Sequence, residues 1–366
     1  MSAPKPDAAR RRRLWLRLHR WISLALALPL MLVALLGSLL VLLKPLDQQW
    51  LNRALFQVPA GAQAPDLLER SRERLQAEFG AGSALTFRPP REPGESLRVI
   101  VRGAWRGSVY LDPRDARELG RRGEREGLYN LVFALHSHLL LDEAGKPLLA
   151  LIALAYGLLL VAGLALWWPR RWPRPWTRAF ACALDRGALR ACFDLHRSGG
   201  VLLGLLIAVP VATGAYMAWK PLGAAVNAVA GRQPAAPPRL GDADADAPRV
   251  SLDAMVARAQ QSVPGAAVGF VQWPGQAGRP LRVRLILLDD PHPNGLSSVW
   301  LHPRSGAVLA LQRWDALDPG ARANSVVYPL HTGELGGWAY ESVNALLGLA
   351  LVRLGGTGLW LWWRRR

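Results

Sequence analysis

The sequence predicts a membrane protein of the α+β class, with four transmembrane helices in two tandem similar halves and a small extracytoplasmic α+β domain in each half. Three observations support this fold class. The hydrophobic residues are concentrated in four blocks, the basic residues cluster at the ends of those blocks, and several motifs occur twice at equal spacing.

Four apolar stretches have about the 20 residues that a helix needs to cross a hydrocarbon core roughly 30 Å thick. They are Ile22–Leu43, Leu148–Trp168, Val201–Trp219 and Val343–Trp363. The fourth contains Arg353 and several glycines, which neighbouring helices can cover. The first stretch is too long for a signal peptide, and no cleavage motif follows it, so we expect a retained anchor.

The net charge of +18 follows the helix ends and does not form one continuous patch. Arginines precede the first stretch, follow the second and close the chain, at Arg10–Arg13, Arg17, Arg20, Arg170, Arg171, Arg174, Arg178 and Arg364–Arg366. The positive-inside rule places these groups and both termini in the cytoplasm. Nucleic-acid binding is disfavoured because it needs a continuous basic surface. We expect a multi-pass protein in the lipid bilayer of a bacterial inner membrane.

These signals divide the chain into seven parts. They are 1–44 (basic N-terminus and first helix), 45–135 (first outer domain), 136–168 (outer-face histidine segment and second helix), 169–195 (cytoplasmic loop), 196–220 (third helix), 221–330 (linker and second outer domain) and 331–366 (outer-face histidine segment and fourth helix).

The helical segments repeat. His136 lies 31 residues before Trp167 (167 − 136), and His331 lies 31 residues before Trp362 (362 − 331). The first and third helices also match, because each opens on a Leu-His-Arg motif, at His19 and His196, and ends on Lys-Pro-Leu. Repeated motifs of this kind predict two halves with the same plan.

The outer segments repeat as well. Leu97–Val99 followed by Ser108–Arg114 recurs as Leu281–Val283 followed by Ser298–Arg304. Alternating Val, Ile and aromatic residues predict a β-hairpin in each half, and the Asp-Pro and His-Pro stretches are typical of turns. Amphipathic helices are expected at Pro65–Phe79 and Ser251–Ser262, and a flexible linker at Gly231–Pro248. We expect each outer domain to be a small α+β unit.

The histidines at the helix ends are the candidate functional residues, because a titratable group at that depth is costly unless it is paired or coordinated. Taken singly, His19 and His196 are more typical of the interfacial belt than of ligands. The topology, however, pairs His19 with His196 at the inner face and His136 with His331 at the outer face. Two axial imidazoles from facing helices are the usual ligands of an electron-transfer haem. Zinc would need further Cys or carboxylate ligands, and none lie at comparable depth.

Three other histidines are weaker candidates. His138 lies two residues from His136, so on a helix the two side chains point in different directions and only one can face a shared metal. The repeat aligns His136 with His331, which favours His136 and keeps His138 as the alternative. His292 and His302 are expected to be solvated turn residues.

The sequence resembles the PepSY-associated transmembrane family, which includes membrane-bound siderophore reductases that carry two haems. The resemblance covers nearly the whole chain, and the matching pieces are His19-Arg20-Trp21, Leu135-His136 with Leu139–Leu141, Asp194–Arg197 and Leu330–Glu334. The two outer units look like PepSY domains. This resemblance implies two haem b groups, held at the iron by His19, His196, His136 and His331, and electron transfer outward to ferric iron in a siderophore. It assigns no separate catalytic side chain.

Rival hypotheses remain. A non-catalytic PepSY protein would bind or regulate an exported peptidase or sensor. A transporter is disfavoured because the halves run in the same orientation and the helices lack acidic or broken segments.

The partners are only partly encoded. No Gly-rich dinucleotide motif follows a predicted strand, so a separate reductase or a quinol is expected as the electron donor. Arg98, Arg102, Arg106, Arg282 and Arg284 are possible contacts for an anionic acceptor, although arginines at alternate strand positions are more typical of a solvated face.

Overall fold

The computed structural model describes residues 6–168, 179–231, 237–240 and 247–364. The chain divides into two compact units. The helical unit comprises Met1–Leu42, Val132–Val226 and Leu330–Arg366, and the sheet unit comprises Leu43–Leu131 and Asn227–Pro329.

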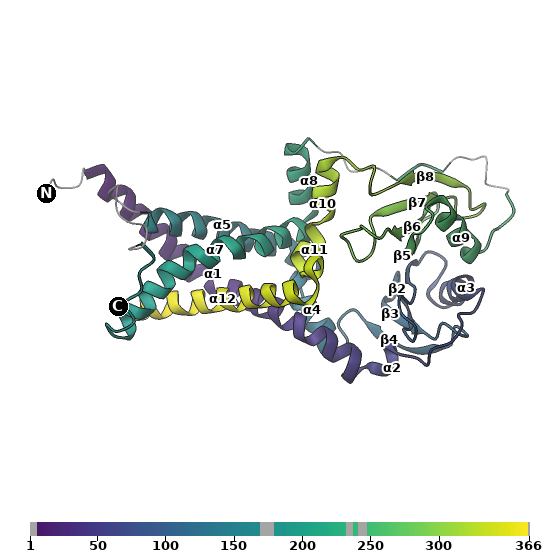
Figure 1. Cartoon of the computed structure of the whole chain (residues 1–366), viewed down its shortest axis with the longest axis horizontal. Helices are drawn as coiled ribbons and strands as arrows, with labels where there is room; N and C mark the ends of the chain where they lie inside the picture. Colours follow the sequence, from purple (N-terminus) through teal and green to yellow (C-terminus); the bar gives the residue numbers. More distant parts are fainter. Residues whose placement is uncertain (1–5, 169–178, 232–236, 241–246, 365–366) are drawn as a thin grey trace. The chain divides into compact units, whose positions relative to one another are not determined.

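Four long helices make up most of the helical unit (Figure 1): α1 (Pro6–Leu46), α5 (Gly145–Trp167), α7 (Ala188–Ala218) and α12 (Gly337–Trp363). Within the described residues, these four are long and apolar enough to cross a membrane. They contain the four predicted stretches except for the terminal Trp168 and Trp219. The prediction of four candidate spans is therefore confirmed.

The helices carry apolar residues on all sides, as expected of membrane spans. Leu28, Leu151, Leu158 and Leu202 are among many large side chains that remain exposed on the outside of the unit. A buried cluster joins the helices inside and contains Leu30, Ile152, Tyr156, Ile207, Leu347 and Leu351. The Tyr156 hydroxyl donates to the Gly204 carbonyl at 2.7 Å, which ties α5 to α7.

Short helices flank the long ones. The π-helical turn η1 (Asp47–Leu51) and α2 (Arg53–Phe56) follow α1, and α8 (Lys220–Val229) follows α7. Before α5 come α4 (Leu128–His138) and η2 (Asp142–Ala144). Before α12 come α10 (Pro319–Ser325), α11 (Val327–Thr332) and η4 (Glu334–Gly336). Thus α4 and α11 carry the histidines that precede the second and fourth spans.

The sheet unit contains eight antiparallel strands in the order β4-β3-β2-β1-β5-β6-β7-β8. Their bounds are β1 (Ala84–Arg88), β2 (Leu97–Arg102), β3 (Arg106–Leu111), β4 (Glu118–Gly123), β5 (Ala267–Trp273), β6 (Leu281–Ile286), β7 (Ser297–Leu301) and β8 (Val308–Gln312). The predicted hairpins are present as β2–β3 and β6–β7, with Arg98 opposite Tyr110 and Arg282 opposite Trp300. We expected two separate outer units, whereas β1 pairs with β5 and joins both segments into one sheet.

One face of this sheet packs on the predicted amphipathic helices, now α3 (Leu67–Phe79) and α9 (Leu252–Ser262) (Figure 1). Alternate strand residues such as Phe87, Val99, Val271 and Val283 are fully buried there. The helix N-termini also cap each other. Asp253 accepts from the Leu68 and Glu69 amides at 3.0 and 2.8 Å, and the Glu69 carboxylate accepts from the Leu252 amide at 2.9 Å.

The opposite face of the sheet is polar and basic, and carries Arg98, Arg102, Arg122, Arg282 and Arg284. Several predicted features lie outside the described residues: the basic group Arg170, Arg171, Arg174 and Arg178, the last two arginines, and much of the linker Gly231–Pro248.

Candidate functional site

The helical unit brings the four predicted histidines together in two pairs. The first pair is His19 of α1 and His196 of α7, whose ring centroids are 6.4 Å apart with an interplanar angle of 82°. The second pair is His136 of α4 and His331 of α11, with centroids 6.1 Å apart and an angle of 31°. The structure therefore reproduces the pairing that topology predicted.

The two pairs lie at opposite ends of the spans. His19 and Gly37 are both on α1, and Gly37 lies against His136. Eighteen residues separate them (37 − 19), which corresponds to about 27 Å at 1.5 Å per residue. The same separation holds on α7 between His196 and Gly214, which lies against His331.

His138 is not part of either pair. Its Nδ1 accepts from the Asp142 amide at 3.3 Å and lies 3.8 Å from the Asp142 carboxylate. His138 thus stabilises the turn between α4 and α5, while His136 faces His331.

Each paired histidine packs against a glycine of a neighbouring helix. A Cβ atom at Gly37 would lie 2.9 Å from His136 Cε1, and one at Gly214 would lie 2.8 Å from His331 Cε1. At the first pair the corresponding distances are 3.7 Å from Gly163 to His19 and 3.2 Å from Gly358 to His196. Since carbon atoms prefer about 3.5–4.0 Å, three of the four rings occupy space that a side chain would fill.

Backbone carbonyls orient the second pair of rings. Nδ1 of His136 lies 2.9 Å from the Val33 carbonyl, and Nδ1 of His331 lies 2.9 Å from the Pro210 carbonyl. Each acceptor stands four residues before the glycine that contacts the same ring. A proton on Nδ1 leaves Nε2 unprotonated and able to bind a metal, which is the usual arrangement of a metal-binding histidine.

The first pair has weaker partners. Nδ1 of His196 lies 3.0 Å from the Thr357 hydroxyl, with the Leu354 carbonyl also facing the ring. The Leu159 carbonyl faces His19, but His19 Nδ1 is buried without a hydrogen bond of ordinary geometry. Leu159 and Leu354 again precede Gly163 and Gly358 by four residues. Each of the four rings therefore faces a backbone carbonyl and, four residues further along the same helix, a glycine.

The ring separations fit two imidazoles on one metal ion. A metal–nitrogen bond of about 2.0 Å plus about 1.1 Å from nitrogen to ring centre, taken twice, gives about 6.2 Å between centroids. The observed 6.4 and 6.1 Å agree with this distance. Within the described residues, no group of three or more His, Cys, Asp and Glu side chains could hold a metal ion. A four-ligand zinc site is thus not found there, and the pairs suit a metal that takes two axial protein ligands, as haem iron does.

The glycines were missed by sequence reasoning, although a signal was present. Gly37 and Gly214 each lie 18 residues after His19 and His196 (37 − 19 and 214 − 196). Gly163 and Gly358 each lie 27 residues after His136 and His331 (163 − 136 and 358 − 331). Only the structure shows that each glycine contacts a histidine of the other pair in this register.

The two remaining histidines do lie in turns, but the prediction that they are solvated is wrong. His302 is buried and accepts from the Ser305 amide at 3.2 Å. His292 is buried, accepts from the Asn294 amide at 3.0 Å and stacks on Tyr328. Both rings satisfy backbone groups of their own turns.

The fold and the paired histidines define a multi-pass membrane protein of the α+β class. The chain belongs to the family described as the PepSY-associated TM region, whose sequence model matches residues 16–365. A search of curated proteins gave no match.

Proposed function

We propose that this protein is a transmembrane di-haem b oxidoreductase that passes electrons to a periplasmic acceptor, ferric iron held by a siderophore, and so releases the iron. The observation that carries the proposal is the presence of two histidine pairs with metal-ligand spacing at opposite ends of the spans. Bound haem would supply one-electron redox chemistry, which no side chain of the pairs provides alone.

The roles of the residues follow from their contacts. His19 and His196 would hold one iron, and His136 and His331 the other. Two histidine ligands to each iron would leave oxygen no place to bind, so bound haem would supply electron transfer alone. The carbonyls of Val33 and Pro210 hold the second pair in the required tautomer. The glycines let each ring approach the neighbouring helix.

The arginine groups support the orientation. In this proposal both termini and the His19–His196 pair face the cytoplasm of a bacterial inner membrane, and the sheet unit is periplasmic. The two segments of the sheet unit would then be tandem PepSY-like domains, one in each half of the chain. The donor would be a separate reductase or a quinol at the inner face.

The reoxidation of reduced protein tests the proposed direction. Purified full-length protein, reduced anaerobically, is mixed with a ferric trihydroxamate siderophore while the reduced haem bands are followed. The wild type should lose these bands, and His331→Ala should retain the bands of the remaining haem.

His138→Ala is the matched control, because this residue lies two positions from His136 but binds Asp142. It should be reoxidised like the wild type. Reoxidation of His331→Ala at the wild-type rate would refute an exit through the second pair. A colourless protein produced with ample haem would instead favour the non-catalytic alternative.

A further inference from the structure

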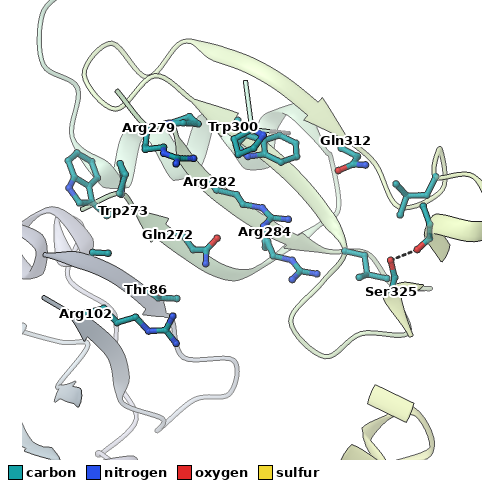
Figure 2. Close-up of a pocket in the computed structure, with 17 residues that line it drawn as sticks. Thr86, Arg102, Gln272, Trp273, Arg279, Arg282, Arg284, Trp300, Gln312 and Ser325 are labelled. Atoms are coloured by element: carbon teal, nitrogen blue, oxygen red, sulfur yellow. Dashed lines mark hydrogen bonds between the residues drawn. The ribbon is translucent and has the colours of Figure 1, made fainter. Parts of the chain in front are cut away.

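The sheet unit contains a cavity of about 500 Å³ on the basic face of its sheet (Figure 2). Residues from β1, β2, β5, β6, β7 and β8 line it, together with α10. This volume is within the range of about 300–1,000 Å³ that is usual for small-molecule sites. The histidine pairs contribute nothing to it.

The lining of the cavity is strongly cationic. Figure 2 shows four arginines around it, Arg102, Arg279, Arg282 and Arg284. No Asp or Glu is among the described residues that line it. The uncharged polar groups of Gln272 and Gln312 and the ring of Trp300 also line the cavity.

Arg282 and Arg284 are the central feature, because both are largely buried and, among the described residues, their hydrogen-bond acceptors are neutral groups. Arg282 donates to the Ser298 hydroxyl at 3.1 and 2.9 Å and lies over the Trp300 ring. Arg284 donates to the Gly295 carbonyl and lies over Phe270, while its Nε is buried without an acceptor. The charge of Asp290 acts on Arg284, but the Asp290 carboxylate accepts its hydrogen bonds from the Leu287 and Leu296 amides.

This burial is unfavourable for the charged side chains. Burial lowers the pKa of Arg282, and burial together with the charge of Arg282 lowers the pKa of Arg284 to about 10. Both groups remain cationic at neutral pH. A buried cation without a counter-ion costs free energy that an arriving anion would recover.

The first hairpin provides an internal comparison. Arg98 matches Arg282, because it donates to the Ser108 hydroxyl at 3.1 Å and lies over Tyr110. The buried cation beside that hairpin is Arg122 of β4, whose guanidinium donates to both carboxylate oxygens of Asp47 at 2.9 Å. In the first half, the chain therefore supplies a carboxylate to the buried guanidinium of Arg122.

Among the described residues, no carboxylate is hydrogen-bonded to Arg282 or Arg284 in this way, although the charge of Asp290 acts on Arg284. In the strand pairing, Gln312 takes the place of Arg122, since Ser298 faces Gln312 as Ser108 faces Arg122. In the sequence repeat, Arg284 takes the place of Ile100, and Gly223 takes the place of Asp47. The second half thus carries its cation at Arg284 instead of at the position of Gln312, and it has no carboxylate at the position that corresponds to Asp47.

We propose that this cavity binds a small anion that carries two or more carboxylate or phosphate groups. Arg282 and Arg284 would each pair with an acidic group in the fork geometry that guanidinium groups favour. Trp300 would form an aromatic wall beside the ligand, and Arg102 and Arg279 would add positive charge at the rim. This inference goes beyond the proposed function and holds whether or not haem is bound.

Calorimetric titration of the full-length protein in detergent tests the proposal. The probes are citrate and pyrophosphate, with trimethyl citrate as the uncharged control. At least one anion should bind in a salt-dependent manner, and the ester should not. The anion that binds more tightly shows whether the site prefers carboxylate groups, as in citrate, or phosphate groups, as in pyrophosphate. Failure of both anions to bind, or equal binding of the ester, would overturn the proposal.

Variants locate the site. Arg284→Gln should weaken binding about tenfold or more, because one charge-assisted contact is worth about that factor. The exposed Arg102→Gln should weaken it less. The control is Arg98→Gln, which removes the counterpart of Arg282 on the first hairpin and should bind like the wild type.

A stability measurement separates binding from folding. Without ligand, Arg284→Gln should have a melting temperature equal to or above that of the wild type, since it removes an unpaired buried charge. A marked loss of stability in Arg284→Gln would make Arg284 a structural residue. Undiminished anion binding in both Arg102→Gln and Arg284→Gln would place any binding elsewhere. Either result would refute this site.

Discussion

Replacing the four glycines that contact the histidines with alanine gives a graded test of the site. In a helix interior, alanine is more stable than glycine by about 0.5–1 kcal/mol, so each change would stabilise the protein if nothing opposed it. The opposing effect depends on the space for the new Cβ. Its distance to the nearest ring atom is 2.8 Å at Gly214, 2.9 Å at Gly37, 3.2 Å at Gly358 and 3.7 Å at Gly163.

The size of the displacement decides the outcome. At Gly214 the His331 ring must move by roughly 0.6 Å to restore ordinary carbon contact. Metal–ligand distances tolerate only about 0.2 Å, so this movement is too large for an unchanged bond to iron. At Gly163 no movement is needed. Gly214→Ala and Gly37→Ala should therefore lose most of the haem at the second pair. Gly358→Ala should lose part of the haem at the first pair, and Gly163→Ala should lose no haem.

The assay is haem per chain together with the melting temperature of the purified variants. Gly157→Ala is the control on α5, because a Cβ at that glycine would meet nothing within 4 Å. Gly157→Ala and Gly163→Ala should match or slightly exceed the wild-type melting temperature. Equal haem loss in Gly163→Ala and Gly214→Ala would refute the reasoning, as would full haem retention in Gly214→Ala.

Three further predictions concern the pairs and the sheet unit. His19→Ala or His196→Ala should remove the haem of the first pair and leave that of the second. His136→Ala or His331→Ala should remove the haem of the second pair and leave that of the first. Difference spectra that showed the same haem lost in all four variants would contradict the pairing. Asp47→Ala leaves Arg122 buried and unpaired, so it should destabilise the protein by about 3–5 kcal/mol in denaturant unfolding, whereas Asp66→Ala, which breaks the exposed pair with Arg70, should change little. The Arg114 side chain holds the pKa of Asp112 below its usual value, so Asp112 stabilises the fold at neutral pH and this contribution is lost as the pH falls below about 4. In Asp112→Asn, the free energy of unfolding should therefore fall less steeply as the pH is lowered through this range. An unchanged pH dependence would count against this assignment.

The elements that the sequence predicted well are those set by local composition. The four spans follow from uninterrupted apolar stretches, and the hairpins follow from alternating residues such as Val99 and Val283. The histidine pairs required one further step, because helix direction alone places His19 beside His196 and His136 beside His331.

The features that the sequence did not reveal depend on contacts between distant segments. Nothing in Leu85 or Trp273 signals that β1 and β5 pair and fuse two outer segments into one sheet. Likewise, Arg282 and Arg284 have the alternation of a solvated face, and only the surrounding β1, β5, β7 and α10 residues bury them. The glycine contacts depend on helix packing in the same way.

The haem content of the purified full-length chain tests the central claim most directly. The account predicts two haem b groups per chain, with the absorption spectrum of six-coordinate, low-spin iron, because each histidine pair would supply two ligands to one iron. A stable ratio of one haem per chain would contradict the assignment of one of the pairs, and a colourless protein produced under haem-replete conditions would contradict the proposed function as a whole.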